Sequence, residues 1–216
     1  MSGSFDKYEV NVTWFVSYPP RHYGSKERKE ACSLIRALKH IGGSHGESYR
    51  LSKQSRLDTK NAKQALDWFG SVSAMILKIQ RPVFPIVFVP IPDSDCILSD
   101  SRIPRTYRLA EAIANRMAKS AAVSDALRWR HQQTPSHNGG TRDSARLLRE
   151  LELVSPPDAG TVILVDDVLT TGAHILASAA RLRSAGFNCR NAICVARTEP
   201  IHNPRTFGIR HTALLG

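Results

Sequence analysis

The chain has 216 residues, of which 42% are hydrophobic and 23% charged, so it can bury a core and is neither intrinsically disordered nor long enough for a multidomain assembly. Lysine and arginine number 30 against 19 acidic residues, and the formal net charge of +11 favours an anionic partner such as a phosphorylated metabolite or a nucleic acid. No apolar run approaches the ~18 residues of a membrane span and the first residues lack a signal-peptide pattern, so we expect a cytoplasmic protein with no membrane partner.

The first 80 residues predict one strand followed by two helices. Residues 8–18 alternate apolar and polar side chains before becoming continuously apolar, as in a strand, and two prolines end the run. Residues 26–40 carry apolar side chains at helical spacing, and so does the stretch from 65 to 79. We expect residues 1–80 to form an N-terminal extension that belongs to the core and acts as a hood over residues 81–216.

From residue 82 onward, apolar runs alternate with amphipathic stretches. The order predicts strands at 85–92, 126–130, 161–165 and 191–197 and helices at 105–121, 146–153 and 174–186. The run TVILV at 161–165 is apolar throughout, which is typical of parallel strands buried on both faces. The sequence therefore predicts an α/β fold with a doubly wound, mainly parallel sheet flanked by helices, whose ligands bind beyond the carboxyl ends of the strands.

The cysteines favour ordinary reduced thiols over a metal site. The chain has four cysteines, Cys32, Cys96, Cys189 and Cys194. They show no C-x-x-C spacing and no partnering H-x-x-x-H motif. We therefore predict no structural zinc.

The most informative motif is VILVDDVLTTGAH, in which a buried strand leads into two acids and then into a short loop at the start of a helix. A helix N-terminus offers unpaired N–H groups and a partial positive charge, so Thr170, Thr171 and Gly172 can enclose a phosphate there. Asp166 and Asp167 would repel a phosphate, and their natural partners are sugar hydroxyls or a metal ion shared with the ligand. The alternative, a plain turn with a threonine cap, explains any single residue but not the ordered string.

This string resembles the phosphoribosyl pyrophosphate (PRPP) motif of the type I phosphoribosyltransferases. Other segments are similar to that family as well: residues 89–95 (VPIPDSD) to its pyrophosphate loop, 105–114 to the following helix, and 128–147 to its basic, mobile loop. Their order and spacing are most similar to the competence-associated ComF group. The resemblance covers the chain from about Glu30 to Arg197.

Two features depart from that group. The ComF group commonly starts with a four-cysteine zinc ribbon, which this sequence lacks. His174 stands at the last position of the phosphate loop (residues 170–174), where the family usually places threonine or serine. Its imidazole either donates one hydrogen bond to the phosphate or points away from it.

The resemblance implies an Mg²⁺-dependent transfer in which a nitrogenous acceptor displaces pyrophosphate at C1 of PRPP. The 5-phosphate would be bound by Thr170, Thr171, Gly172, Ala173 and His174. Asp166 and Asp167 would bind the ribose hydroxyls. They would also bind Mg²⁺, mainly through the ligand or through water. Together with Arg130 they would be the catalytic residues. Pyrophosphate would be bound by Pro90, Ile91, Pro92, Asp93, Arg105, Arg108, Arg128 and Arg142, although each arginine taken alone also fits a solvated surface charge.

Further positions have both a functional and a structural interpretation. Gly139 and Gly140 fit a lid over the site, while His131 and His137 are candidate proton handlers or solvent-facing side chains. The acceptor, a base or amine, would bind near the N-terminal extension. Four aromatic residues there could stack on it, or belong to the core: Trp14, Phe15, Tyr18 and Tyr23.

The main rival to a transferase is a ComF-like accessory or effector protein that binds PRPP or a nucleotide in DNA uptake or defence, without transferase activity. The positive charge fits single-stranded DNA or another nucleic acid as its partner. A hydrolase that consumes PRPP is a third alternative, which no residue separates from a transferase. The oligomeric state stays open, although family members often pair as homodimers.

Overall fold

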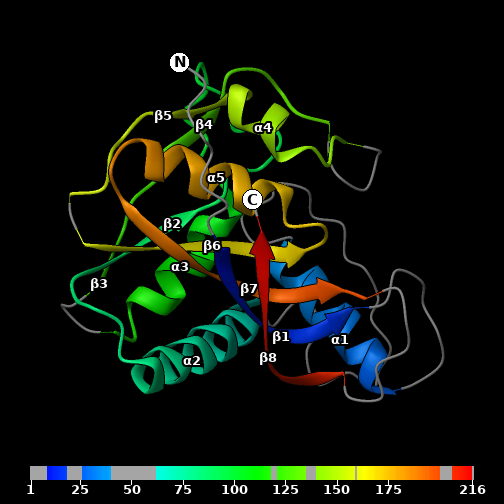
Figure 1. Cartoon of the computed structure of the whole chain (residues 1–216). Helices are drawn as coiled ribbons and strands as arrows, with labels where there is room; N and C mark the ends of the chain where they lie inside the picture. The colour runs from blue at the N-terminus through cyan, green and yellow to red at the C-terminus, as the bar shows by residue number, and fades with distance from the viewer. Residues whose placement is uncertain are drawn as a thin grey trace.

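The centre of the fold is a six-stranded sheet with the order β3-β2-β6-β7-β1-β8 (Figure 1). The structure is a computed structural model, and it describes residues 9–18, 26–39, 62–117, 121–134, 140–158, 160–199 and 206–215. All neighbouring strands are parallel except β8, which runs antiparallel to β1. The strand bounds are β1 Glu9–Tyr18, β2 Ile86–Pro90, β3 Ala121–Val123, β6 Thr161–Leu169, β7 Asn188–Thr198 and β8 Phe207–Leu215.

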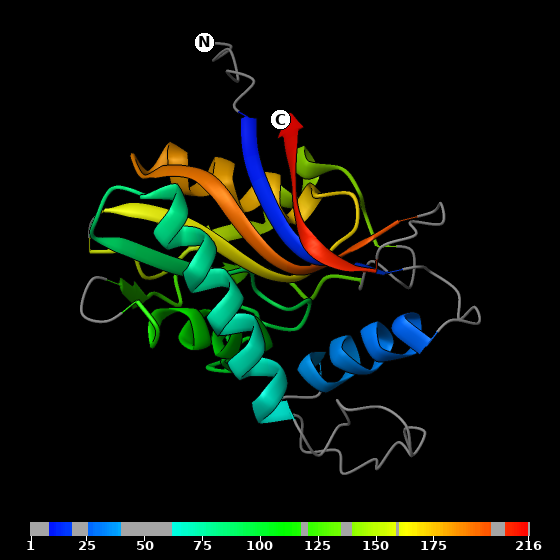
Figure 2. The ribbon, with the colours of Figure 1, turned by 90° about the horizontal axis from the view of Figure 1, so that it is seen from below.

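Helices cover both faces of this sheet and form two apolar cores (Figure 2). One face carries α1, α2 and α3, while the other carries α5, α4 and a small antiparallel sheet of β4 and β5. This arrangement confirms the predicted fold class. The bounds are α1 Lys26–Lys39, α2 Ala62–Gln80, α3 Arg105–Ala114, α4 Ser144–Glu150, α5 Ala173–Ser184, β4 Leu127–Trp129 and β5 Leu151–Leu153.

Strand β1 lies inside the main sheet, between β7 and β8. Its side chains alternate between the two cores, with Val12 on the α5 face and Phe15 on the α1–α2 face. The N-terminal strand is thus a member of the sheet, and the hood role of the extension stays a prediction.

Three elements differ from the sequence-based expectation. The helix expected at 146–153 ends at Glu150, because Leu151–Leu153 pairs with β4. The helix expected at 105–121 ends at Ala114, and Ala121 instead opens the edge strand β3. Strand β8 was not predicted at all.

All four cysteines are buried and free of disulfides. Within the described residues, no helix combines the length and the apolar character that crossing a membrane requires.

Helices α2 and α3 cross so closely at Gly70 that a side chain there has no room. A Cβ at this position would lie 2.2 Å from the backbone oxygen of Ala112. We expect Gly70→Ala to lower the free energy of unfolding by about 2 kcal/mol, because the helices must separate and the gain in helix propensity offsets only part of that cost. The thermal midpoint, measured by calorimetry, should fall by about 5 °C. Lys78→Ala on the exposed side of α2 is the control and should leave it unchanged; an equal fall in both variants would contradict the close crossing.

Candidate functional site

The carboxyl ends of β2 and β6 lie side by side at a switch point in the strand order of the sheet. From β2 the chain proceeds through α3 to β3 on one side, and it then returns to β6 on the other side of β2. Pro90, the last residue of β2, is in register with Val165 of β6. Open α/β sheets bind ligands at such a reversal, so the segments that leave these two strands form the candidate site.

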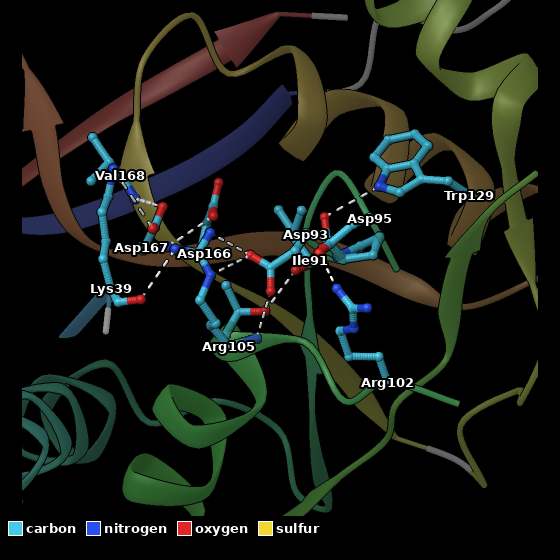
Figure 3. Close-up of polar contacts among 12 residues, drawn as sticks. Lys39, Ile91, Asp93, Asp95, Arg102, Arg105, Trp129, Asp166, Asp167 and Val168 are labelled. Carbon is cyan, nitrogen blue, oxygen red and sulfur yellow. Dashed lines mark hydrogen bonds and ion pairs between the residues drawn. The ribbon is translucent and has the colours of Figure 1, made fainter. Parts of the chain in front are cut away.

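Asp166 and Asp167 lie in the last part of β6, which continues to Leu169 rather than ending at Val165 as expected. Both carboxyl groups are half-buried. The backbone N–H of Asp167 donates to Oδ1 of Asp166 at 2.8 Å, and that of Val168 donates to Oδ1 of Asp167 at 2.6 Å (Figure 3). One carboxyl oxygen of each residue is thus fixed by the backbone.

Burial, followed by the charge of Asp167, raises the pKa of Asp166 to about 8. Lys39 at the end of α1 works against this shift, but its Nζ lies 4.0 Å from the nearer Asp167 oxygen. At neutral pH the ligand-free pair therefore retains a proton. A ligand that brings a cation or hydroxyl groups stabilises the ionised form of such a pair.

This donor set fits Mg²⁺. Mg²⁺ prefers carboxylate oxygens and water, and it commonly binds through one or two carboxylates together with substrate phosphates. The other metal-type cluster among the described residues, Asp93, Asp95 and Cys96, does not fit. Its carboxylates pair with Arg105 and Arg102, and burial followed by the charge of Asp93 raises the pKa of the Cys96 thiol to about 11.

The predicted phosphate loop leads into a helix with a weak cap. The N-cap residue of α5, Gly172, has no side chain, and the N–H of Ala173 donates to Thr171 Oγ1 at 3.5 Å, the long limit of a hydrogen bond. By contrast, Asp143 caps α4 at 2.9 Å. Thr170 and Thr171 are exposed, so their hydroxyls are accessible beside a helix N-terminus that can accept an anion.

Gly172 is required at the start of α5. Its φ of +83° lies in the left-handed region, which disfavours other residues. A Cβ there would also lie 2.4 Å from Cδ1 of Leu214. The glycine predicted to permit close backbone approach therefore has a conformational role as well.

His174 is half-buried and packs against an aromatic ring. Its imidazole centroid lies 5.5 Å from that of Trp129, with an interplanar angle of 55°. Burial lowers the pKa of His174, so the ring is neutral at pH 7. The sequence left two orientations open, and the structure supplies an aromatic contact that neither included.

The predicted pyrophosphate loop is held by hydrogen bonds at each step. The N–H of Ile91 donates to Val165 O at 2.9 Å, and the Thr106 hydroxyl donates to Ile91 O at 2.6 Å. Pro90, Ile91 and Pro92 are buried, and the N–H and carbonyl of Ile91 are both engaged within the protein, so the roles of these three residues toward pyrophosphate stay predictions.

Asp93 and Arg105 bind each other. The guanidinium donates to Oδ1 of Asp93 at 2.6 Å, and the backbone N–H of Arg105 donates to Oδ2 at 2.7 Å (Figure 3). Arg105 also donates to the backbone oxygen of Lys39 at 3.3 Å. The hydrogen bond and charge of Asp93 outweigh burial and raise the pKa of Arg105, with help from Asp167 and Asp166. Asp93 and Arg105 were both predicted for the site from the sequence, but their mutual bond and the nearby Lys39 were not.

The remaining predicted arginines are not gathered at this point. Arg128 is buried and donates to both carboxylate oxygens of Asp125 at 2.5 Å. Arg108 is exposed and pairs with Glu111 at 3.2 Å. Arg130 donates to Glu152 at 2.5 Å, and Arg142 is exposed. Their roles toward pyrophosphate stay predictions, and we leave Arg128 out of the proposed site because its guanidinium is already satisfied.

The candidate acceptor and lid residues divide into core, surface and undescribed positions. Trp14 and Phe15 are 4% and 2% exposed and belong to the two cores, which is the structural one of the two alternatives given for them above. His131 is exposed and contacts Glu150 at 3.0 Å, while Gly140 is buried. The Tyr18 side chain and residues Tyr23, His137 and Gly139 lie outside the described part of the structure.

No family model matches the sequence, and no curated protein matches it significantly. Solved structures similar to this chain include hypoxanthine phosphoribosyltransferase from Staphylococcus aureus, at 12% identity and TM-score 0.42 over 66% of this chain and 70% of that one. Orotate phosphoribosyltransferase from Aeropyrum pernix matches at 18% identity and TM-score 0.38, over 77% and 83%. Adenine phosphoribosyltransferase from Thermoanaerobacter pseudethanolicus matches at 14% and 0.40, over 69% and 92%. These are likenesses of fold and carry no information about substrate.

Proposed function

We propose that this protein binds PRPP with Mg²⁺ and transfers its phosphoribosyl group to a nitrogenous acceptor with release of pyrophosphate. The observation that carries the proposal is the pair of adjacent, half-buried carboxyl groups of Asp166 and Asp167, which end β6 just ahead of the N-terminus of α5 in the chain. The order of these groups in the sequence matches the family motif as well.

Each part of PRPP has a matching group in the chain. The first N–H groups of α5, with the hydroxyls of Thr170 and Thr171, would bind the 5-phosphate. Asp166 and Asp167 would accept hydrogen bonds from the ribose hydroxyls. The backbone N–H groups of residues 93–95 would face the pyrophosphate, while the bond to Arg105 holds Asp93 in place.

The reaction breaks the bond between C1 and the pyrophosphate oxygen, whose electron pair leaves with pyrophosphate, and forms a bond from C1 to the acceptor nitrogen, which loses a proton. Mg²⁺, when bound, supplies positive charge for the departing pyrophosphate. The chain's own contribution is electrostatic: Asp166 and Asp167 favour positive charge developing on the ribose, and nearby cationic side chains favour the leaving anion. Lys39 and Arg105 are already placed beside the carboxyl pair.

Calorimetric titration with PRPP, with and without Mg²⁺, tests the proposal. We expect micromolar binding that requires Mg²⁺, followed by pyrophosphate release when an acceptor base is supplied. Binding without release from any base would favour the ComF-like accessory alternative. Absence of PRPP binding, together with salt-sensitive binding of single-stranded DNA, would overturn the proposal.

Arg130 offers a test of the electrostatic role. It follows β4 and is held by Glu152, so it borders the segment predicted to cover the substrate. We expect Arg130→Ala to lower kcat at least tenfold while changing the Kd for PRPP less than threefold, because its charge is needed most as pyrophosphate leaves. Steady-state kinetics and titration measure the two quantities. Glu152→Gln is the matched variant, since it removes the carboxylate that pairs with Arg130 and keeps the arginine. Equal kcat in the wild type and in Arg130→Ala would show that Arg130 has no role in the mechanism.

A further inference from the structure

Trp129 is fixed to the pyrophosphate loop and the turn that follows it. Its side chain is fully buried, and its indole N–H donates to Pro92 O at 3.3 Å (Figure 3). Its backbone N–H donates to Cys96 O at 3.0 Å, and its carbonyl accepts from the N–H of Leu98 at 2.9 Å. Three hydrogen bonds, one from the indole and two from the backbone, therefore fix Trp129 to residues 92–98.

The same indole contacts the phosphate loop through His174. The two rings form a tilted pair with centroids 5.5 Å apart, an arrangement in which aromatic rings attract each other. His174 is the second residue of α5, so its position follows that of the first turn, whose N–H groups are the proposed phosphate donors. Burial keeps this imidazole neutral, which suits packing against a ring better than pairing with an anion.

We propose that His174 is a positioning residue that joins the phosphate loop to the pyrophosphate loop through Trp129, so that binding at one loop strengthens binding at the other. This inference rests on the proposed function of the site. Both loops also follow adjacent strands, β2 after Pro90 and β6 after Leu169, and Ile91 is hydrogen-bonded to Val165, so the ring contact adds a second link between segments already joined at their base. A ligand that orders one loop then offsets part of the ordering cost of the other. A threonine at this position would have a hydroxyl for the phosphate but no ring for Trp129.

The coupling is measured with two separate ligands in the presence of Mg²⁺. One is pyrophosphate, and the other is 1,4-anhydroribitol 5-phosphate, a ribose 5-phosphate analogue whose missing 1-hydroxyl leaves room for pyrophosphate. Calorimetry gives the Kd of pyrophosphate alone and with the analogue at saturation. In the wild type, we expect the analogue to tighten pyrophosphate binding about tenfold, within the usual range of coupling between sites.

Two substitutions of this half-buried residue separate positioning from phosphate binding. His174→Phe keeps a ring against Trp129, and we expect it to retain the coupling within about twofold. His174→Thr removes the ring and restores a family-like hydroxyl, and we expect it to abolish the coupling while the analogue alone still binds. Equal coupling in all three proteins would overturn the inference but not the proposed function. If neither ligand binds the wild type, the result contradicts both the inference and the proposed function.

Hydrogen exchange supplies a second measurement that needs pyrophosphate alone. Adding pyrophosphate should slow amide exchange in the first turn of α5 in the wild type and in His174→Phe, but not in His174→Thr. A purely structural role of His174 would change the exchange of the ligand-free protein and leave the response to pyrophosphate intact. That result would also overturn the inference.

Discussion

Replacing Asp166 and Asp167 together with asparagine should abolish Mg²⁺-dependent PRPP binding while leaving the fold intact. Asparagine keeps an oxygen at the Oδ1 position, so the backbone N–H groups of Asp167 and Val168 retain their acceptors. The lost negative charge removes the groups proposed for the ribose hydroxyls and for Mg²⁺. With each charged hydrogen bond worth about 2 kcal/mol, the Kd should rise at least about 100-fold.

Calorimetric titration with PRPP and Mg²⁺ measures this loss, and circular dichroism with a thermal melt checks the fold. Glu9→Gln combined with Asp158→Asn is the control, because it makes the same acid-to-amide change at two exposed positions, at the start of β1 and just before β6. That control should bind PRPP like the wild type. Unchanged binding in the Asp166/Asp167 variant would remove the pair from the PRPP site.

The fold class and the central motif could be predicted because they rest on local patterns. The apolar run at 161–165 indicates a strand buried on both faces, and the structure places β6 between β2 and β7. Small hydroxyl residues and glycine before a helix indicate an open N-terminus, and the N-cap residue of α5 is Gly172, which has no side chain to cap it. Each inference needs only neighbouring residues.

The contacts of the site could not be predicted because they join distant segments. Asp93 and Arg105 both matched the family pattern, but nothing local shows that they bind each other or that Lys39 comes near Asp167. Arg128 has the same appearance in sequence as Arg130, yet one is buried against Asp125 and the other is exposed beside Glu152.

Strand β8 and the ring contact of His174 depended on tertiary partners. Residues 207–215 become a strand by pairing with β1, which lies nearly 200 residues earlier, as the 2.9 Å bond between Thr13 and His211 illustrates. The departure of His174 from the family pattern was visible, whereas its partner Trp129 is set by the position of β4. Sequence reasoning therefore located an unusual residue without showing what it contacts.

Asp166→Asn alone should make the ligand-free protein more stable, and increasingly so as the pH rises from about 4 to about 8. Burial and the charge of Asp167 raise the pKa of Asp166 to about 8 in the folded state, whereas the unfolded value is about 4. Below pH 4 the carboxyl is protonated in both states and costs nothing. Between these values it ionises in the unfolded chain first, so the stability of the wild type falls as the pH rises, and above 8 the penalty is constant.

Asparagine has no proton to lose, so the variant avoids this penalty at every pH. Even half of the displacement in pKa corresponds to about 3 kcal/mol at high pH, or about 10 °C in the thermal midpoint for a chain of this size. Calorimetry at pH 4.5, 6, 7 and 8.5 should show a difference between variant and wild type that starts near zero and grows to that value, while Asp158→Asn shows none. A difference independent of pH would mean that Asp166 is ionised throughout, and the ligand-free pair would then carry no proton to exchange for a cation. The predicted gain in stability and the predicted loss of PRPP binding come from the same carboxyl group, because under the proposed function the desolvated carboxylate destabilises the ligand-free protein and gains a favourable partner only when PRPP and Mg²⁺ bind.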